Sequence, residues 1–336
     1  MVDSTAQSIS QFTSNSPAET ESSSILSLQN VSKTYGEFTA VNAISLSIPK
    51  GSIYGFLGPN GAGKTTTIRM ILDIIKPSSG SINILGHSSA LDVRNQIGYL
   101  PEEKGLYKKM KVWALIQYFA MLKGMEKHEA KTQAWHLLEK YGLKDFAEEK
   151  VESLSKGMAQ KVQVLSAVAH EPELVILDEP FSGLDPVNQT VLEDLITDMA
   201  ANGQTVIFST HVMQHAERLC DHILLIAKGR KIFDGTVSEA KATIPRRVML
   251  ESADDISSLN SIAGVMEISR DEELDANDSA RQQWQLQISE QLNPQDILRS
   301  CFEKNISLSR FEFTEPSLHD VFVHLVGDDA KEHAFR

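Results

Sequence analysis

The sequence lacks three features, each of which would have indicated a particular class of protein. It holds only two cysteines, Cys220 and Cys301, so no disulfide framework is expected. No apolar run approaches the roughly 20 residues that cross a bilayer, and the longest candidates are 174–177 and 223–227. Lys and Arg number 32 against 45 Asp and Glu, for a net charge of −13, which is the wrong sign for binding nucleic-acid phosphates. We therefore expect no membrane span and no nucleic-acid partner.

Composition and charge divide the chain into three parts. With 336 residues and 41% hydrophobic side chains, the chain is long enough for one large globular domain or two of ordinary size. Residues 25–244 carry 23 basic and 24 acidic side chains, whereas residues 245–336 carry 9 and 18. The C-terminal part is therefore expected to be a separate accessory module with a solvated acidic loop at 271–278. Residues 1–24 hold eight Ser and three Thr but no Lys or Arg, which predicts a disordered tail.

The pattern of residues 25–244 predicts an α/β domain. Runs rich in Val, Ile, Leu and Ser predict strands, and a Gly-rich turn followed by helical apolar spacing comes after the third of them. An aromatic insertion predicts a helical subdomain over about residues 102–170. Later short apolar runs between helical segments are typical of buried parallel strands. The expected elements are strands 25–33, 40–48, 52–57, 81–85, 174–177, 205–209 and 223–226, and helices 65–75, 112–125 and 128–141.

Beyond residue 245 the pattern changes to that of a small α+β domain. Strands and helices are expected in the order strand, helix, strand, strand, helix, strand, which is the split βαβ order of ferredoxin-like folds. A last helix follows. The expected elements are strands 247–251, 265–270, 283–289 and 307–313, and helices 254–262, 294–304 and 317–326.

The clearest motif of the chain is a complete phosphate-binding loop. Residues 58–65 match G-x-x-x-x-G-K-[ST] and lie between a predicted strand and a predicted helix, the context that this motif requires. Glycines let backbone N–H groups curve around phosphate oxygens, and the following helix adds the positive end of its dipole. We expect Lys64 to reach the β and γ phosphates and Thr65 to help hold Mg²⁺. The predicted ATP-binding residues are Gly58, Pro59, Asn60, Gly61, Ala62, Gly63, Lys64, Thr65 and Thr66.

Two adjacent acids at the end of a buried strand complete the predicted chemistry. Asp178 and Glu179 directly follow the apolar run 174–177. Adjacent acids at a strand end are usually exposed loop charges, but a phosphate-binding loop on the same chain favours a functional role. We expect Asp178 to hold a metal-bound water and Glu179 to act as the general base.

Residues 26–235 resemble the ATP-binding subunits of ABC transporters. The most specific element is Leu-Ser-Lys-Gly-Met at 154–158, which is similar to the family signature LSGGQ and lies about twenty residues before the Asp178 strand, as in the family. The resemblance implies a P-loop ABC ATPase fold, in which two subunits enclose two ATP molecules. It also implies that Ser155 and Gly157 of one subunit face the γ-phosphate held by the other.

Three further positions take roles from this resemblance alone. Tyr35 is similar to the aromatic residue that stacks on adenine, a role that suits its π-face. Asp185, in Ser-Gly-Leu-Asp at 182–185, lies in a loop that resembles the one contacting the opposite subunit. His211 resembles the switch histidine that contacts the γ-phosphate and orients the attacking water.

The chain departs from the family pattern at two places. The loop after the strand that ends at residue 100 usually presents a Gln to the metal and the attacking water, whereas here it presents Glu102 and Glu103. A carboxylate there can still contact Mg²⁺ or water but brings negative charge toward the γ-phosphate. In the signature, Lys156 replaces the first Gly and Met158 replaces Gln; Lys156 either adds a cation near the phosphates or faces solvent.

A second constellation offers zinc ligands. His211, His215, Cys220 and His222 lie within twelve residues, and His211 and His215 are at i, i+4. Cys220 and His222 fall where a helix gives way to a strand, so they are expected to point in unrelated directions. The spacing matches no recognised zinc site, and both cysteines are expected to be packed thiols.

The resemblance implies an ATPase that works with other chains. ATP and Mg²⁺ are the implied cofactors, and a second copy and a separate polytopic membrane subunit are the implied partners. The chain would sit on the cytoplasmic face of the membrane through that subunit, which would dock on the aromatic insertion at 113–119. Residues 98–103, the signature at 154–158 and the C-terminal Pro-Ser-Leu-His-Asp-Val-Phe at 316–322 resemble those of sodium-extruding and ABC-2 type export ATPases. The alternatives are a soluble ABC ATPase acting on ribosomes or DNA, and a weakly hydrolysing nucleotide-dependent regulator.

Overall fold

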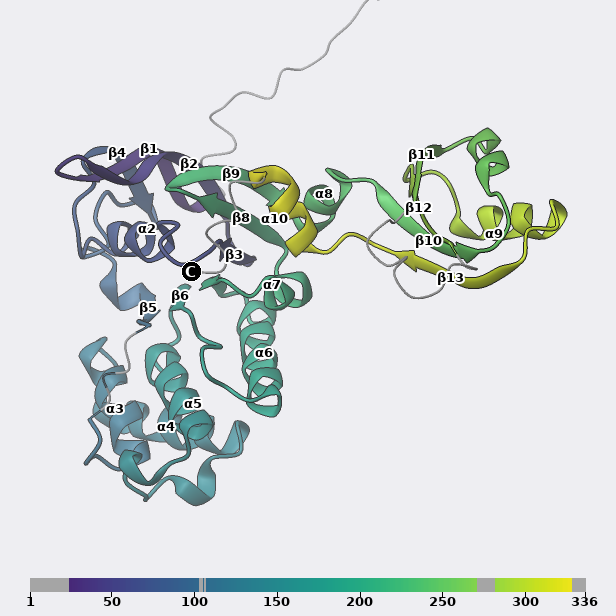
Figure 1. Cartoon of the computed structure of the whole chain (residues 1–336). Coiled ribbons are helices and arrows are strands. Elements are labelled where there is room, and N and C mark those ends of the chain that lie inside the picture. Colours follow the sequence, from purple (N-terminus) through teal and green to yellow (C-terminus); the bar gives the residue numbers. More distant parts are fainter. Residues whose placement is uncertain (1–23, 103–104, 106, 271–281, 328–336) are drawn as a thin grey trace, which may run out of the picture.

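The computed structural model describes residues 24–102, 105, 107–270 and 282–327. Except for Ser24, the predicted N-terminal tail lies outside the described residues, as do Glu103 and the acidic loop at 271–278. Figure 1 shows the arrangement of the rest: a layered unit of strands and helices, here called the cassette, a group of helices beneath it, and a smaller module of strands and helices to one side.

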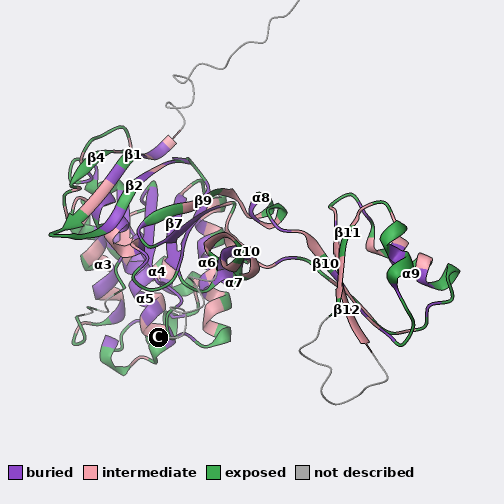
Figure 2. Ribbon diagram, turned by 45° about the horizontal axis from the view of Figure 1, so that its top comes forward, coloured by how far each residue is buried: buried purple, intermediate pink, exposed green. Residues whose placement is uncertain are grey.

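A six-stranded sheet forms the centre of the cassette. Its order is β5-β6-β7-β3-β8-β9, with parallel pairing throughout except for the antiparallel β9. The parallel strands are almost entirely buried, which explains their continuous Val, Ile, Leu and Phe runs. Figure 2 shows this buried layer at the centre of the cassette. The strands are β3 (Ile53–Leu57), β5 (Ile97–Leu100), β6 (Leu174–Asp178), β7 (Thr205–Thr210), β8 (His222–Ala227) and β9 (Arg230–Thr236).

The carboxyl ends of the parallel strands position the site. Strand β3 runs into the phosphate-binding loop, β6 ends at Asp178, and β7 ends at Thr210, one residue before His211. Because β6 pairs with β7 and β7 pairs with β3, these three strand ends lie side by side. Ligands of open α/β sheets bind at this edge.

A second, antiparallel sheet of order β2-β1-β4 covers helix α2. Its buried residues pack with those of α2 and with one face of the central sheet in a single core. Helix α2 ends four residues before the predicted end at 75, because the chain turns at Asp73, whose φ is +59°. The elements are β1 (Ser24–Tyr35), β2 (Phe38–Pro49), β4 (Ser79–Ile84) and α2 (Lys64–Ile71).

The predicted helical subdomain consists of three main helices below the sheet (Figure 1). Apolar side chains of α3, α4 and α5 pack in the same core as strand β6. Among the described residues, every helix is too short or too polar to cross a bilayer. The helices are α3 (Val112–Leu122), α4 (Lys127–Lys140) and α5 (Lys156–Val168), with short 3₁₀ turns at Arg94–Gln96, Lys144–Phe146 and Val151–Ser153.

The accessory module is a four-stranded antiparallel sheet of order β11-β12-β10-β13. This order is the one that the predicted split βαβ arrangement requires. The helix expected at 254–262 is wrong: only a five-residue 3₁₀ helix, Ser257–Ser261, forms there. The other elements are β10 (Arg246–Ser252), β11 (Val265–Arg270), β12 (Gln282–Ile288), β13 (Leu308–Thr314) and α9 (Pro294–Glu303).

The last described helix, α10 (Leu318–Val326), returns to the cassette. Its buried side chains Leu318, Val321 and Phe322 pack with residues of β8, α7 (Met213–Leu219) and α8 (Val237–Ala242). The backbone N–H of Leu318 donates a 2.7 Å hydrogen bond to the carboxylate of Glu217 on α7. The boundary expected at residue 245 separates the cassette from the accessory module along the sequence. Helix α10 lies beyond this boundary but packs on the cassette.

Candidate functional site

The phosphate-binding loop can close tightly only because of its glycines. Gly58 has φ +154°, and a Cβ on it would lie 2.1 Å from the carbonyl oxygen of Ile226. Gly63, at φ +108°, caps α2 in the left-handed region, and a Cβ there would lie 2.7 Å from the carbonyl of Ala40. The N–H groups of the first turn of α2 have no helical carbonyl to bind, so they are available to an anion.

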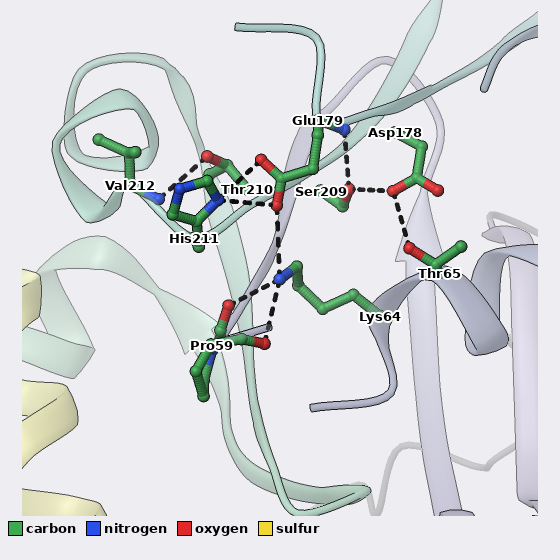
Figure 3. A network of polar contacts seen from close by, with 10 residues as sticks. Pro59, Lys64, Thr65, Asp178, Glu179, Ser209, Thr210, His211 and Val212 are labelled. Carbon is green, nitrogen blue, oxygen red and sulfur yellow. Dashed lines mark hydrogen bonds and ion pairs between the residues drawn. The ribbon is translucent and has the colours of Figure 1, made fainter. Parts of the chain in front are cut away.

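Lys64 is buried at the start of α2 and points back into the loop (Figure 3). Its ammonium donates to the carbonyl of Gly58 at 2.7 Å and of Pro59 at 3.3 Å. The same ammonium lies 3.4 Å from Oε1 of Glu179. The loop thus holds a desolvated cation at the position that the sequence assigns to the phosphates.

Asp178 is held by two hydroxyl groups. Thr65 Oγ1 donates to Asp178 Oδ1 at 3.3 Å, and the Ser209 hydroxyl donates to the same oxygen. Burial raises the pKa of the Asp178 carboxyl, and the hydrogen bonds from Ser209 and Thr65 oppose that shift. A buried carboxylate beside a threonine hydroxyl is an oxygen-ligand pair that a hard divalent cation would satisfy.

Glu179 lies at the centre of the network in Figure 3. Its φ is +49°, in the left-handed region that non-glycine residues rarely occupy. Its backbone N–H is shared between the hydroxyl (3.0 Å) and the carbonyl (3.2 Å) of Ser209, which hold this conformation. Its carboxylate oxygens lie 3.1 and 3.0 Å from Nδ1 of His211. The structure therefore brings together Lys64, Glu179 and His211, three of the residues expected in the site.

An open cavity of about 350 Å³ lies over the loop. Its lining contains predicted residues 59–66, Glu102 and Glu179, together with Phe38 and Ala40. Phe38 is 64% exposed, and Tyr35 is paired directly opposite it across the β1–β2 hairpin. Tyr35 does not line the cavity, and the Lys33 ammonium lies 5.2 Å from its ring centre. Sequence reasoning missed Phe38, although its position three residues after Tyr35 was a signal.

The predicted signature and loop residues lie outside this cavity. Ser155 caps α5 and accepts from the N–H of Met158, while Asp185 caps α6 (Pro186–Ala201) and accepts from the N–H of Asn188 at 3.0 Å. That backbone hydrogen bond lowers the pKa of the Asp185 carboxyl. Gly157 packs on Asn188, since a Cβ on the glycine would lie 2.4 Å from its amide. One chain alone therefore does not bring these residues to the phosphate-binding loop.

Lys156 extends from the signature to the neighbouring loop. A Cβ on Gly183 would lie 2.1 Å from the Lys156 ammonium, so the lysine side chain lies against that loop.

The structure also bears on the four candidate zinc ligands. Among the residues that it describes, no three histidine, cysteine or acidic side chains are grouped so as to hold a metal ion.

Comparisons with known proteins agree with this geometry. Residues 41–182 match the family model described as ABC transporter, and residues 235–326 match the C-terminal domain of DrrA1-3-like ATP-binding proteins. The chain is 42% identical over 304 residues to the ABC transporter ATP-binding protein YhaQ of Bacillus subtilis, covering 90% of this chain and 99% of that one. The chain belongs to the ATP-binding subunits of ABC transporters.

Two further comparisons support this membership. The linearmycin resistance ATP-binding protein LnrL of Bacillus subtilis is 31% identical over 315 residues, covering 90% of this chain and 98% of that one. A solved structure of an ATP-binding subunit of an ABC transporter superposes with a TM-score of 0.60 at 31% identity, covering 65% of this chain and 92% of that one. The match to LnrL includes the accessory module.

Proposed function

We propose that the chain hydrolyses ATP to ADP and phosphate and thereby drives a separate membrane subunit. The observation that carries the proposal is the position of the Glu179 carboxylate. It lies beside the Lys64 ammonium and the His211 ring, at the edge of the cavity over the phosphate-binding loop.

The proposed reaction uses these three side chains in distinct roles. The loop N–H groups and Lys64 hold the β and γ phosphates, and Lys64 balances the charge that develops on them. Glu179 accepts the proton of the attacking water, while His211 keeps the carboxylate in place and contacts the γ-phosphate. The oxygen of this water bonds to the γ-phosphorus as the bond from the γ-phosphorus to the bridging oxygen breaks, so phosphate forms and ADP leaves with the bridging oxygen.

Thr65, Asp178 and Glu102 are the residues proposed to hold Mg²⁺ with the nucleotide. The hydroxyl of Thr65 and the buried Asp178 carboxylate face each other, and Glu102 lines the same cavity. When bound, the ion supplies positive charge to the phosphate oxygens and orients them. The hydrogen bonds from Thr65 and Ser209 orient the Asp178 carboxylate for this role.

A second copy of the chain is the proposed partner at the nucleotide. Ser155, Gly157 and Asp185 lie outside the cavity of their own chain, so their proposed contact with ATP requires another chain. Ser155 and Asp185 are exposed and already oriented as helix caps. Closure of two chains over two ATP molecules would then couple binding to movement.

The membrane subunit is proposed to dock on an aromatic surface of the helical subdomain. Tyr107, Tyr118 and Phe119 form a cluster with ring centres 5.6 to 6.3 Å apart. Met121 and Leu122 are exposed at the end of α3, the helix that carries Tyr118 and Phe119. The resistance function in the name of LnrL favours export as the direction of transport, with the chain on the cytoplasmic face of the membrane.

Glu102 favours one alternative, a regulator that binds ATP and hydrolyses it slowly. Its carboxylate lines the cavity with that of Glu179, and two carboxylates near a γ-phosphate weaken its binding. A sharp fall in ATP turnover from the parent to Glu179→Gln would rule out the regulator.

The ribosome- or DNA-acting alternative finds no support, because the compared relatives that match over most of this chain are ABC transporter and drug-resistance ATP-binding proteins.

Co-purification from detergent-solubilised membranes tests the membrane partnership. We expect the tagged chain to bring down a polytopic membrane protein and Tyr118→Glu to lose it, because a charge would enter an aromatic interface. The matched control is Phe302→Glu, which places the same charge at an exposed aromatic position of the accessory module. Recovery of ribosomes or DNA in place of a membrane protein would contradict the proposal.

A further inference from the structure

His215 is a buried histidine with no role in the proposed reaction. It lies on α7, four residues after His211, and is 3% exposed. Helix α7 has seven residues, and its buried side chains are Met213, His215 and Ala216. Met213 and Ala216 belong to the core shared with α10, whereas His215 packs elsewhere.

The ring of His215 stacks on Phe181. The two ring centres are 4.1 Å apart and the planes are 14° from parallel. Phe181 is buried in the turn that follows Glu179, and the N–H of Ser182 donates to the carbonyl of Glu179 within that turn. Phe181 also packs edge-on against Phe208 of β7, with ring centres 5.7 Å apart. His215 therefore touches the turn that fixes the backbone of Glu179.

A carboxylate fixes the other edge of the His215 ring. Nδ1 lies 3.1 Å from Oε1 of Glu193 on α6, and Arg218 forms a 2.7 Å ion pair with the same oxygen. Burial lowers the pKa of His215, against the opposing effect of Glu193. A neutral ring next to a carboxylate carries its proton on Nδ1 and donates it. The charged groups that act on His215 are Glu193 of α6, Arg218 of α7 and Glu179 of the turn.

These contacts join three elements that the proposed reaction needs in register. Helix α7 follows His211, the turn carries Glu179, and α6 begins directly after its N-cap Asp185. We propose that His215 is a positioning residue, which holds α7 against Phe181 and Glu193 so that Nδ1 of His211 stays within hydrogen-bonding distance of Glu179. This inference rests on the proposed function for its effect on turnover.

A purely structural histidine would behave differently. It would stabilise the fold without setting the contact between His211 and Glu179, so its loss would lower stability and leave that contact unchanged. A positioning residue acts on the geometry of the catalytic groups, where a displacement of about 1 Å costs up to about 100-fold in rate. ATP binding, which depends on the phosphate-binding loop, should change little.

Two substitutions separate the contacts of His215. His215→Phe keeps a ring against Phe181 but removes the donor to Glu193, and His215→Gln keeps a donor but removes the ring. Glu193→Ala leaves the ring in place and serves if either His215 variant fails to fold. The matched control is His222→Gln, since His222 also stacks on an aromatic ring, that of Tyr54, at 6.1 Å and 5°.

The experiment combines kinetics with NMR of the histidine rings. Turnover (kcat) and ATP affinity (Kd, measured with EDTA) are determined for each variant. The His211 ring signals, assigned with His211→Asn, are compared with those in Glu179→Ala, where the contact is lost. We expect kcat to fall about 10- to 100-fold with Kd changed less than about twofold, and the His211 signals to move toward those of the Glu179→Ala protein.

Each outcome decides the inference. Unmoved His211 signals in the His215 variants would overturn it, whatever happens to kcat. Moved signals with parental kcat would also overturn it, since the contact would not control turnover. If the parent itself hydrolyses no ATP, the proposed function fails, and the NMR comparison still shows whether His215 sets the His211–Glu179 contact.

Discussion

The Lys64 ammonium and the Glu179 carboxylate lie 3.4 Å apart, and their side chains are 5% and 9% exposed. Each charge of such a buried ion pair depends on the other for its stability, because removing one partner leaves the other charged and desolvated. The Glu179 carboxylate partly neutralises the cation that the proposed reaction assigns to the phosphates. ATP must therefore compete with Glu179 for Lys64.

Replacing Glu179 should destabilise the nucleotide-free protein and spare ATP binding. Glu179→Gln leaves Lys64 with carbonyl acceptors alone, and we expect the free energy of unfolding to fall by about 3 kcal/mol. Saturating ATP should restore most of that loss, because the phosphates replace the missing charge. Urea denaturation with and without ATP measures both.

The control for this prediction is an exposed ion pair. Lys50 and Glu173 lie 3.6 Å apart, with side chains 60% and 52% exposed. Glu173→Gln should change the stability by less than about 1 kcal/mol, and ATP should make no difference to it. Equal losses in the two variants would refute the buried pair as a source of stability.

Most residues of the proposed catalytic network could be predicted from the sequence because they follow short, local patterns. The phosphate-binding loop and Asp178–Glu179 each lie at the end of an apolar run, and parallel strands bring such ends together. Ser209 was not predicted. Its hydroxyl donates to Asp178 and accepts from the N–H of Glu179, and such a contact between strands 30 residues apart has no local signal. Phe38 could not be predicted from the family resemblance, which assigns the aromatic role to Tyr35, its cross-strand partner.

Phe38 should contribute to the binding of the nucleotide base. Its exposed ring lines the cavity over the phosphate-binding loop, and stacking of a base on an aromatic ring is worth about 1 to 3 kcal/mol. Phe38→Ala should therefore weaken ATP binding about 5-fold or more and leave the binding of inorganic triphosphate unchanged. Fluorescence titration with each ligand measures the difference.

Phe302 supplies the control for this substitution. It is an exposed phenylalanine on α9 of the accessory module, outside the nucleotide cavity. Phe302→Ala should bind ATP like the parent. A Phe38→Ala protein that binds ATP as tightly as Phe302→Ala would exclude Phe38 from the base site.

The packing of α10 on the cassette should be a major source of stability. Phe322 is buried against α7 and α8 side chains, and truncating such a ring costs about 3 to 5 kcal/mol. We expect Phe322→Ala to lower the stability of the cassette itself, measured by urea denaturation. His324→Ala changes an exposed position of the same helix and should cost less than about 0.5 kcal/mol. Similar losses in both variants would argue against the observed packing.

The return of α10 could not be read from the sequence. Its amphipathic pattern indicates a helix with one buried face, but a pattern does not identify the surface that covers that face.

At 254–262 the sequence predicts a helix that does not form. Asp254 accepts from the N–H of Ser307, and Asp255 accepts from the N–H of Ser257. These side chain–backbone bonds compete with helix formation and leave one short 3₁₀ turn.

His170 should make the stability depend on pH. Burial lowers its pKa to about 4, from an ordinary value of about 6.5. Nε2 donates to the carbonyl of Ile97 at 3.2 Å, while Nδ1 is buried without a partner. The unfolded chain thus binds a proton between pH 6.5 and 4 that the folded chain excludes, so stability falls as the pH falls through that range.

The variant His170→Gln isolates this effect. It keeps a donor for Ile97 but cannot take up a proton, so it should lose roughly 2 to 3 kcal/mol less stability than the parent between pH 7 and pH 4. Urea denaturation at the two pH values gives the difference, and His324→Gln, at an exposed position, should follow the parent. If His170→Gln lost as much stability as the parent between pH 7 and pH 4, His170 would have to protonate freely in the folded protein.

ATP turnover by the purified chain, alone and with any membrane protein that co-purifies with it, tests the central claim most directly. We predict turnover in the parent, loss of ATP binding in Lys64→Ala, and retained binding with turnover reduced at least about 100-fold in Glu179→Gln. Turnover in Glu179→Gln equal to that of the parent would contradict the assignment of Glu179 as the base and, with it, the proposed mechanism.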